Sequence, residues 1–126
     1  MIEVFSIASG AVLGALSRFY ITNFITAILP PFFPFGTLFV NLTGCFLIGF
    51  AFALFEETIV KPEYRLFLTT GFLGSYTTFS TFGLESMQMI RSGEYMEVIV
   101  NIIASNLIGL FFVFTGMFVA RFLLHT

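Results

Sequence analysis

Charged residues divide the chain into long uncharged stretches, of which four contain 14, 37, 19 and 23 residues. A transmembrane helix needs about 20 mostly apolar residues. The stretch of 37 is too long for one helix, and Pro30, Pro31 and Pro34 divide it in two. The pattern therefore predicts one all-α domain, residues 1–126, with four transmembrane helices at residues 3–28, 36–55, 66–92 and 96–122.

Composition places the chain among integral membrane proteins. Hydrophobic residues make up 58% and charged residues 10%, whereas about a quarter of a soluble domain is charged. The lone Cys45 and the single His125 cannot form a disulfide framework, a metal cluster or a nucleophilic triad. A net charge of −2 without a basic run gives no sign of nucleic-acid binding. We therefore expect neither an enzyme nor a nucleic-acid partner.

The distribution of basic residues leaves the orientation in the membrane open. Four spans place both termini and the central loop on one face of the membrane. An excess of Lys and Arg normally marks the cytoplasmic face. Lys61, Arg65 and Arg121 belong to this face, and Arg91 and the deeper Arg18 to the other. Three against two is almost no bias. Either the chain inserts both ways, as a homodimer of oppositely oriented copies, or another feature fixes one orientation.

Small and polar residues mark helix faces that cannot point at lipid. In the first span Gly10 and Gly14 form a G-x-x-x-G face that allows close helix packing. Four short helices bury little surface against each other, so we expect an oligomer. In the second span an Asn amide exposed to lipid would lack hydrogen bonds. The face of the second span consists of Thr37, Asn41 and Gly44. The matching face of the fourth span consists of Asn101, Ser105 and Gly109, with Asn106 beside them.

These two faces have two interpretations. Each can hold the bundle together by interhelical hydrogen bonds worth about 1 kcal/mol. Alternatively, the two helices share a polar track through the membrane.

The third span has an unusual composition for a transmembrane helix. Residues 69–85 contain seven Ser or Thr, three Gly and one acid, Glu85. Gly and Thr are poor helix formers, and their cluster at 74–78 predicts a break, although a kinked helix satisfied by hydroxyl groups is the alternative. Unwound backbone in a membrane must be buried in protein or line a cavity. Its free carbonyls can bind a cation.

Phe79 and Phe82 lie three residues apart in this span, interleaved with Ser80 and Thr81. In a chain with 20 Phe such a pair usually packs in the core. The edge of a Phe ring is positive, however, so ring edges and hydroxyl donors can surround a small anion without a fixed charge. Glu85 is a candidate functional residue because acids within a membrane are rare and commonly functional. The alternative is that Glu85, at the end of this span, reaches the membrane interface.

The motifs in three spans resemble those of the Fluc (CrcB) family of fluoride channels. The segment 71–82 with Glu85 resembles the third helix of that family, 36–49 the second, and 14–19 a motif in the first. The similarity extends over all four spans, with a looser match in the fourth. It implies a passive channel in the bacterial plasma or inner membrane that exports fluoride and protects against its toxicity.

The resemblance also implies an architecture and a set of site residues. The channel would be an antiparallel, dual-topology homodimer with two fluoride pores and one structural sodium ion, Na+, at its centre. The sodium would be held by the backbone carbonyls of Gly74 and Thr77 from both subunits. The implied pore residues are Phe79 and Phe82 as ring-edge ligands, Asn41 as a donor, and Ser80, Thr81 and Glu85 as a polar track, with Arg18 and Thr37 near a vestibule.

Two other functions compete with this one. A small dual-topology multidrug antiporter has a similar size, but it exchanges protons through a membrane carboxylate, for which Glu85 is the candidate here. A non-transporting assembly subunit would explain the glycine faces and leave the hydroxyl groups of residues 69–81 unexplained.

Overall fold

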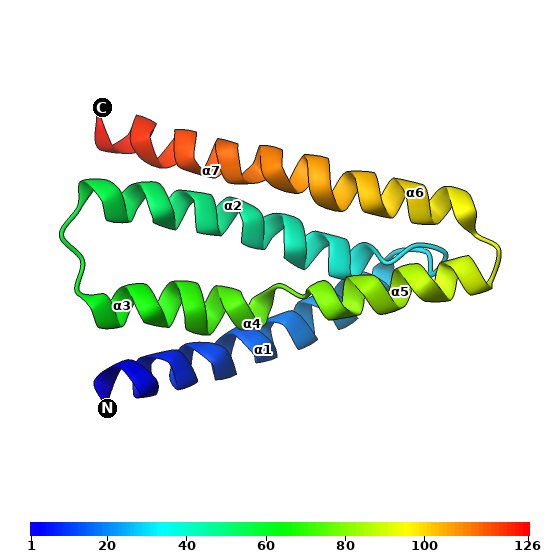
Figure 1. Cartoon of the computed structure of the whole chain (residues 1–126), viewed down its shortest axis with the longest axis horizontal. Helices are drawn as coiled ribbons and strands as arrows, with labels where there is room; N and C mark the ends of the chain where they lie inside the picture. Colours follow the sequence, from blue (N-terminus) through cyan, green and yellow to red (C-terminus); the bar gives the residue numbers. More distant parts are fainter.

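The computed structural model describes all 126 residues and contains helices without strands. Figure 1 shows helical rods that run side by side in alternating directions, with both termini and the connection from α2 to α3 at one end of the molecule. The elements are α1 (Ile2–Ile28), α2 (Phe35–Glu57), α3 (Pro62–Leu66), η1 (Phe67–Leu73), α4 (Gly74–Tyr76), α5 (Phe79–Arg91), α6 (Tyr95–Ile103), η2 (Ala104–Ile108) and α7 (Gly109–Leu124).

The rods have the length and surface of membrane spans. α1, α2 and the continuous helix 95–124 are each long and apolar enough to cross a membrane. The other rod, residues 62–91, runs from α3 to α5 and is interrupted after Tyr76. Many large apolar side chains are exposed on the outside, among them Phe111, Phe114 and Phe118 of α7. The chain is therefore a multi-pass membrane protein.

Small residues bring the helix backbones into contact inside the bundle. A methyl group added to Gly14 of α1 would lie 2.1 Å from the backbone carbonyl oxygen of Phe72 in η1. A methyl group on Gly116 of α7 would lie 2.1 Å from the carbonyl oxygen of Phe46 in α2. The G-x-x-x-G face of Gly10 and Gly14 is thus used within the chain, where close packing takes the place of a large apolar core.

The third rod is broken where its composition predicts a break. The backbone is extended at Thr77 (ψ 157°) and at Thr78 (φ −148°, ψ 118°), and helix resumes at Phe79. The Thr78 hydroxyl accepts a hydrogen bond from the Thr81 N–H at 3.2 Å and so caps α5. Gly74 at the start of the predicted segment remains helical, so the break is confined to two residues.

Candidate ion pathway beside the helix break

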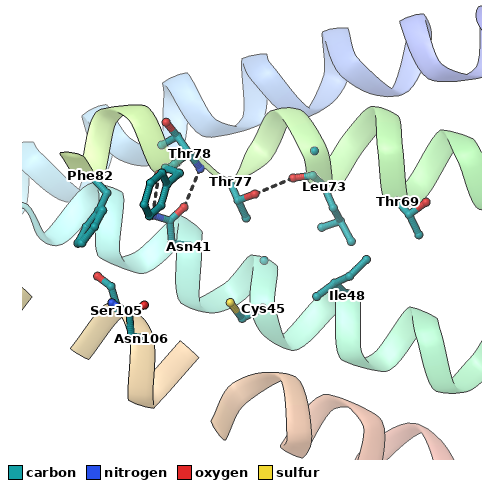
Figure 2. Close-up of a pocket in the computed structure, with 13 residues that line it drawn as sticks. Asn41, Cys45, Ile48, Thr69, Leu73, Thr77, Thr78, Phe82, Ser105 and Asn106 are labelled. Atoms are coloured by element: carbon teal, nitrogen blue, oxygen red, sulfur yellow. Dashed lines mark hydrogen bonds between the residues drawn. The ribbon is translucent and has the colours of Figure 1, made fainter. Parts of the chain in front are cut away.

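A groove of about 380 Å³, lined by apolar and uncharged polar side chains, lies beside the break. Figure 2 shows side chains from α2, from the third rod and from η2 converging on it. No Lys, Arg, Asp or Glu lines the groove. Its lining residues are Asn41, Gly44, Cys45, Ile48, Thr69, Leu73, Gly74, Thr77, Thr78, Phe79, Phe82, Ser105 and Asn106.

Asn41 holds the broken segment against α2. Its Nδ2 donates to the Thr78 carbonyl oxygen at 3.0 Å, and its Oδ1 accepts from the Thr78 N–H at 2.8 Å (Figure 2 shows the second of these bonds). The side chain therefore satisfies both backbone groups of a residue that has left the helix. The two bonds confirm the interpretation that this helix face holds the bundle together by interhelical hydrogen bonds. The role of Asn41 as a donor to fluoride is implied by the resemblance alone, and one of the two N–H groups of the amide remains available to a ligand.

The clamp also changes the hydrogen bonding of the carbonyls at the break. In a continuous helix the Thr78 N–H would bond to the Gly74 carbonyl, but here it donates to Asn41 instead. The Thr77 carbonyl accepts a long hydrogen bond of 3.4 Å from Nη1 of Arg18. Arg18, which the resemblance implies near a vestibule, thus lies against the break in the isolated chain. The lone pairs left on these carbonyl oxygens are cation ligands by their chemistry.

Phe79 and Phe82 form an aromatic pair at one end of the groove. Their ring centroids are 5.5 Å apart and the ring planes are tilted by 36°. Phe79 is 82% exposed, whereas Phe82 is only partly exposed. A ring as exposed as that of Phe79 gains little by packing within its own subunit. Core packing within the subunit therefore does not account for this ring, which, like the other exposed apolar side chains, faces lipid or a partner.

Thr37 and Glu85 lie together beyond the groove. The Thr37 hydroxyl donates to Oε1 of Glu85 at 2.8 Å, and Oε2 of Glu85 is buried without a hydrogen-bond partner. Glu85 also lines a second cavity of about 300 Å³ at the 29–35 turn, together with Gln88 and Glu94. Thr37 is buried at 4% exposure. Glu85 thus joins the buried Thr37 to the cavity at the 29–35 turn.

Ser80 and Thr81 do not line the groove of the isolated chain. The Thr81 hydroxyl accepts from Oγ1 of Thr78 at 2.9 Å, and Ser80 is exposed on the outside of α5. Of the track that the resemblance implies, these two hydroxyl groups are therefore not part of the groove lining, although Thr81 is bonded to Thr78, which is.

The polar residues of the fourth rod separate into two groups. Asn101 is 2% exposed and donates from Nδ2 to the Ser86 hydroxyl at 3.2 Å. Ser105 donates to Oδ1 of Asn101 at 3.4 Å and lines the groove next to Asn106. Sequence reasoning assigned no role to Asn106 or to Thr78. For Thr78 the signal was its position at the end of the cluster of poor helix formers, residues 74–78.

A bundle of four helical rods, with an uncharged groove that carries several polar side chains beside a broken helix, is typical of a small multi-pass membrane protein with an ion pathway. The comparison with known families agrees: residues 5–117 match the family described as CrcB-like protein, Camphor Resistance (CrcB). The chain belongs to this family.

Relatives within the family carry a functional name. The chain is 40% identical over 122 residues to the fluoride-specific ion channel FluC of Dehalococcoides mccartyi strain BAV1, covering 96% of this chain and 94% of the relative. It is 45% identical over 115 residues to the protein of the same name from Hydrogenobaculum sp., covering 90% and 93%. It is 42% identical over 114 residues to that of Aquifex aeolicus, covering 90% and 92%.

Proposed function

We propose that this chain is a fluoride-selective passive channel that lets fluoride leave the cytoplasm and so limits its toxicity. The observation that carries the proposal is the identity of 40–45% over nearly the whole chain to proteins named fluoride-specific ion channel. The groove supplies chemistry that suits this ion, because its polar groups are neutral donors and ring edges. The relatives are channels by name, so the chain is a transporter without enzymatic activity.

The physical problem of fluoride conduction is dehydration. Fluoride holds its water strongly, and a buried ion without replacement contacts is costly. A fixed Lys or Arg in the path would bind the ion too tightly, whereas several weak sites allow entry and exit. The remaining N–H of Asn41, hydroxyl groups and the ring edges of Phe79 and Phe82 provide such sites. A negative cell interior then drives the anion outward by about 2.3 kcal/mol per 100 mV.

The antiporter alternative finds no support among the relatives, which carry the name of a channel. Its carboxylate candidate, Glu85, accepts a hydrogen bond from Thr37 and lies outside the groove. A passive channel is therefore the function that both the relatives and the uncharged groove favour.

Ion efflux from liposomes separates these functions. Purified protein in liposomes loaded with potassium fluoride should release fluoride when valinomycin allows potassium to follow, and a fluoride electrode would record it. Liposomes loaded with chloride should release far less of this anion, because donors in a narrow path spaced for fluoride cannot replace the hydration shell of a larger ion. Proton-coupled uptake of a cationic drug without any fluoride release would contradict the proposal.

The channel is proposed to be an antiparallel homodimer. The groove is open on one side, and Phe79 projects from the subunit at 82% exposure. Lys and Arg residues are nearly balanced between the two ends of the bundle, three against two, so that both orientations can insert. A second copy in the opposite orientation would cover the ring of Phe79 and complete a pathway along each groove.

A structural sodium ion at the centre of this dimer is proposed on the chemistry of the break. The Gly74 carbonyl has lost the helical donor of residue 78, and the Thr77 carbonyl has only the long bond from Arg18. Two such oxygens from each of two subunits would form a set of four oxygen ligands. The cation would neutralise carbonyl dipoles that otherwise face one another in a medium of low dielectric constant.

Removing the Thr77 hydroxyl should leave the sodium site intact, because the proposed ligand is the backbone carbonyl. Thr77→Val keeps the methyl group that contacts Gly44 and loses only the hydroxyl bond to the Leu73 carbonyl. Its thermal unfolding in detergent should still shift upward with sodium, and its fluoride flux should stay near that of the wild type. Asn41→Leu is the contrasting variant: without the clamp the Thr78 N–H can return to the Gly74 carbonyl, and the sodium-dependent shift should disappear.

A sodium-dependent shift lost in Thr77→Val but kept in Asn41→Leu would assign the site to the hydroxyl and contradict the proposal. Fluoride flux strictly coupled to sodium movement would contradict a purely structural role.

A further inference from the structure

Asn106 is a polar residue at membrane depth that none of the roles above uses. It lies on η2, in the middle of the fourth rod, and lines the groove together with Ser105. Consecutive residues of an α-helix point about 100° apart, because one turn takes 3.6 residues. The wider π-helical turn over Ala104–Ile108 lets two neighbouring polar side chains line the same groove. Such local widening is frequent at functional sites.

The amide of Asn106 has unused hydrogen-bonding capacity. Its Nδ2 donates to the Ile102 carbonyl oxygen at 2.7 Å, which is the one hydrogen bond its side chain makes in the chain. An Asn amide carries two N–H groups, so the second is free. A free donor exposed to hydrocarbon would be costly. Its position in the groove, across from Asn41 and Phe82 (Figure 2), gives it access to a polar ligand instead.

We propose that Asn106 is a second amide donor to fluoride, placed on the opposite wall of the groove from Asn41. This inference rests on the proposed channel function and names a further residue of the same pathway. An anion in the groove would meet N–H groups from α2 and from η2, with the positive edges of Phe82 and Phe79 at one end. The Ser105 hydroxyl donates to Asn101, so in this arrangement Asn106 supplies the donor from the fourth rod.

Neutral donors on two walls serve conduction as well as binding. A hydrogen bond to an ion is stronger than one between neutral groups, but an amide binds an anion far less tightly than a guanidinium does. Two amides on facing walls allow the ion to exchange one partner for the other as it moves. This arrangement meets the requirement for several weak sites.

Substitution of Asn106 tests the inference. Asn106→Leu keeps the branched shape of the side chain and introduces a better helix former but removes both N–H groups, and Asn106→Asp keeps the shape while replacing the donor by an acid. Fluoride efflux per assembled dimer should fall by about tenfold to a hundredfold in Asn106→Leu, as expected for one lost bond to an ion, and at least as far in Asn106→Asp. Asn106→Ser keeps a shorter donor and should give intermediate flux.

The matched control is Leu107→Ala, one residue along on η2, which is 65% exposed and does not line the groove. Its flux should equal that of the wild type. Wild-type flux in Asn106→Leu, in liposomes where the wild type conducts fluoride, would overturn the inference and leave the channel function standing. Equal losses in the Leu and Ser variants would also overturn it, because they would assign Asn106 a role in packing. Absence of fluoride flux in the wild type would instead overturn the proposed function and this inference with it.

Discussion

Isoleucine at position 79 or 82 should reduce fluoride efflux sharply, by about tenfold to a hundredfold if the ring edge contributes as much as a hydrogen bond to an ion. Isoleucine keeps an apolar side chain of moderate size but removes the positive edge that would face the anion. The two rings are neighbours, with centroids 5.5 Å apart, and both line the groove. Each single variant should therefore lose flux, and the double variant should lose little more.

The control for this prediction is the same substitution at Phe114, which is 65% exposed on α7 and outside the groove. Phe114→Ile should conduct normally. If the rings of Phe79 and Phe82 only pack, their replacement costs at most about 1–2 kcal/mol of stability as a change of shape. Flux per assembled dimer would then stay near that of the wild type. Normal flux in both single variants would mean that the anion takes another path.

Adding positive charge to the loop between α2 and α3 should nearly abolish transport when the altered chain is the only copy in the cell. Ile59 is fully exposed there, and Ile59→Lys with Val60→Lys raises the charge at the end that already carries three basic residues. Every copy should then insert with this end in the cytoplasm. An antiparallel dimer needs both orientations, so fluoride resistance of the cells should be lost.

The partner experiment changes the opposite end of the bundle. Ser92→Lys with Glu94→Lys, in the turn between α5 and α6, should favour the reverse orientation and should also fail alone. Expression of the two altered chains together should restore fluoride resistance, because each supplies one orientation. Resistance that is normal with the first variant alone, or wild-type termini found on a single side of the membrane, would exclude the antiparallel dimer.

Much of this architecture could be predicted from local features of the sequence. The uncharged stretches and the prolines at 30, 31 and 34 are sufficient to predict four helices, because span length depends only on bilayer thickness. The cluster of Gly and Thr at 74–78 predicts a break because helix propensity is a property of each residue. The aromatic pair Phe79 and Phe82 could be singled out by spacing and by the hydroxyl groups around it.

Tertiary contacts decided the features that depend on partners distant in the sequence. The break falls at Thr77 and Thr78 because the amide of Asn41, on another helix, satisfies the backbone of Thr78. The pair Gly10 and Gly14 packs against η1 within the same chain, which the motif alone could not specify.

The fourth rod shows the same division between sequence and structure. Asn101 and Ser105 are four residues apart, and α-helical spacing therefore predicts that they lie on one helix face. The structure places Asn101 in the core beside Ser86, whereas the π-helical turn of η2 lets Ser105 and Asn106 line the groove together. Sequence determined which residues are too polar for lipid. Only the packing of the rods determined which of them bond to each other and which keep an unused donor, because a hydrogen bond forms only between groups brought within about 3 Å.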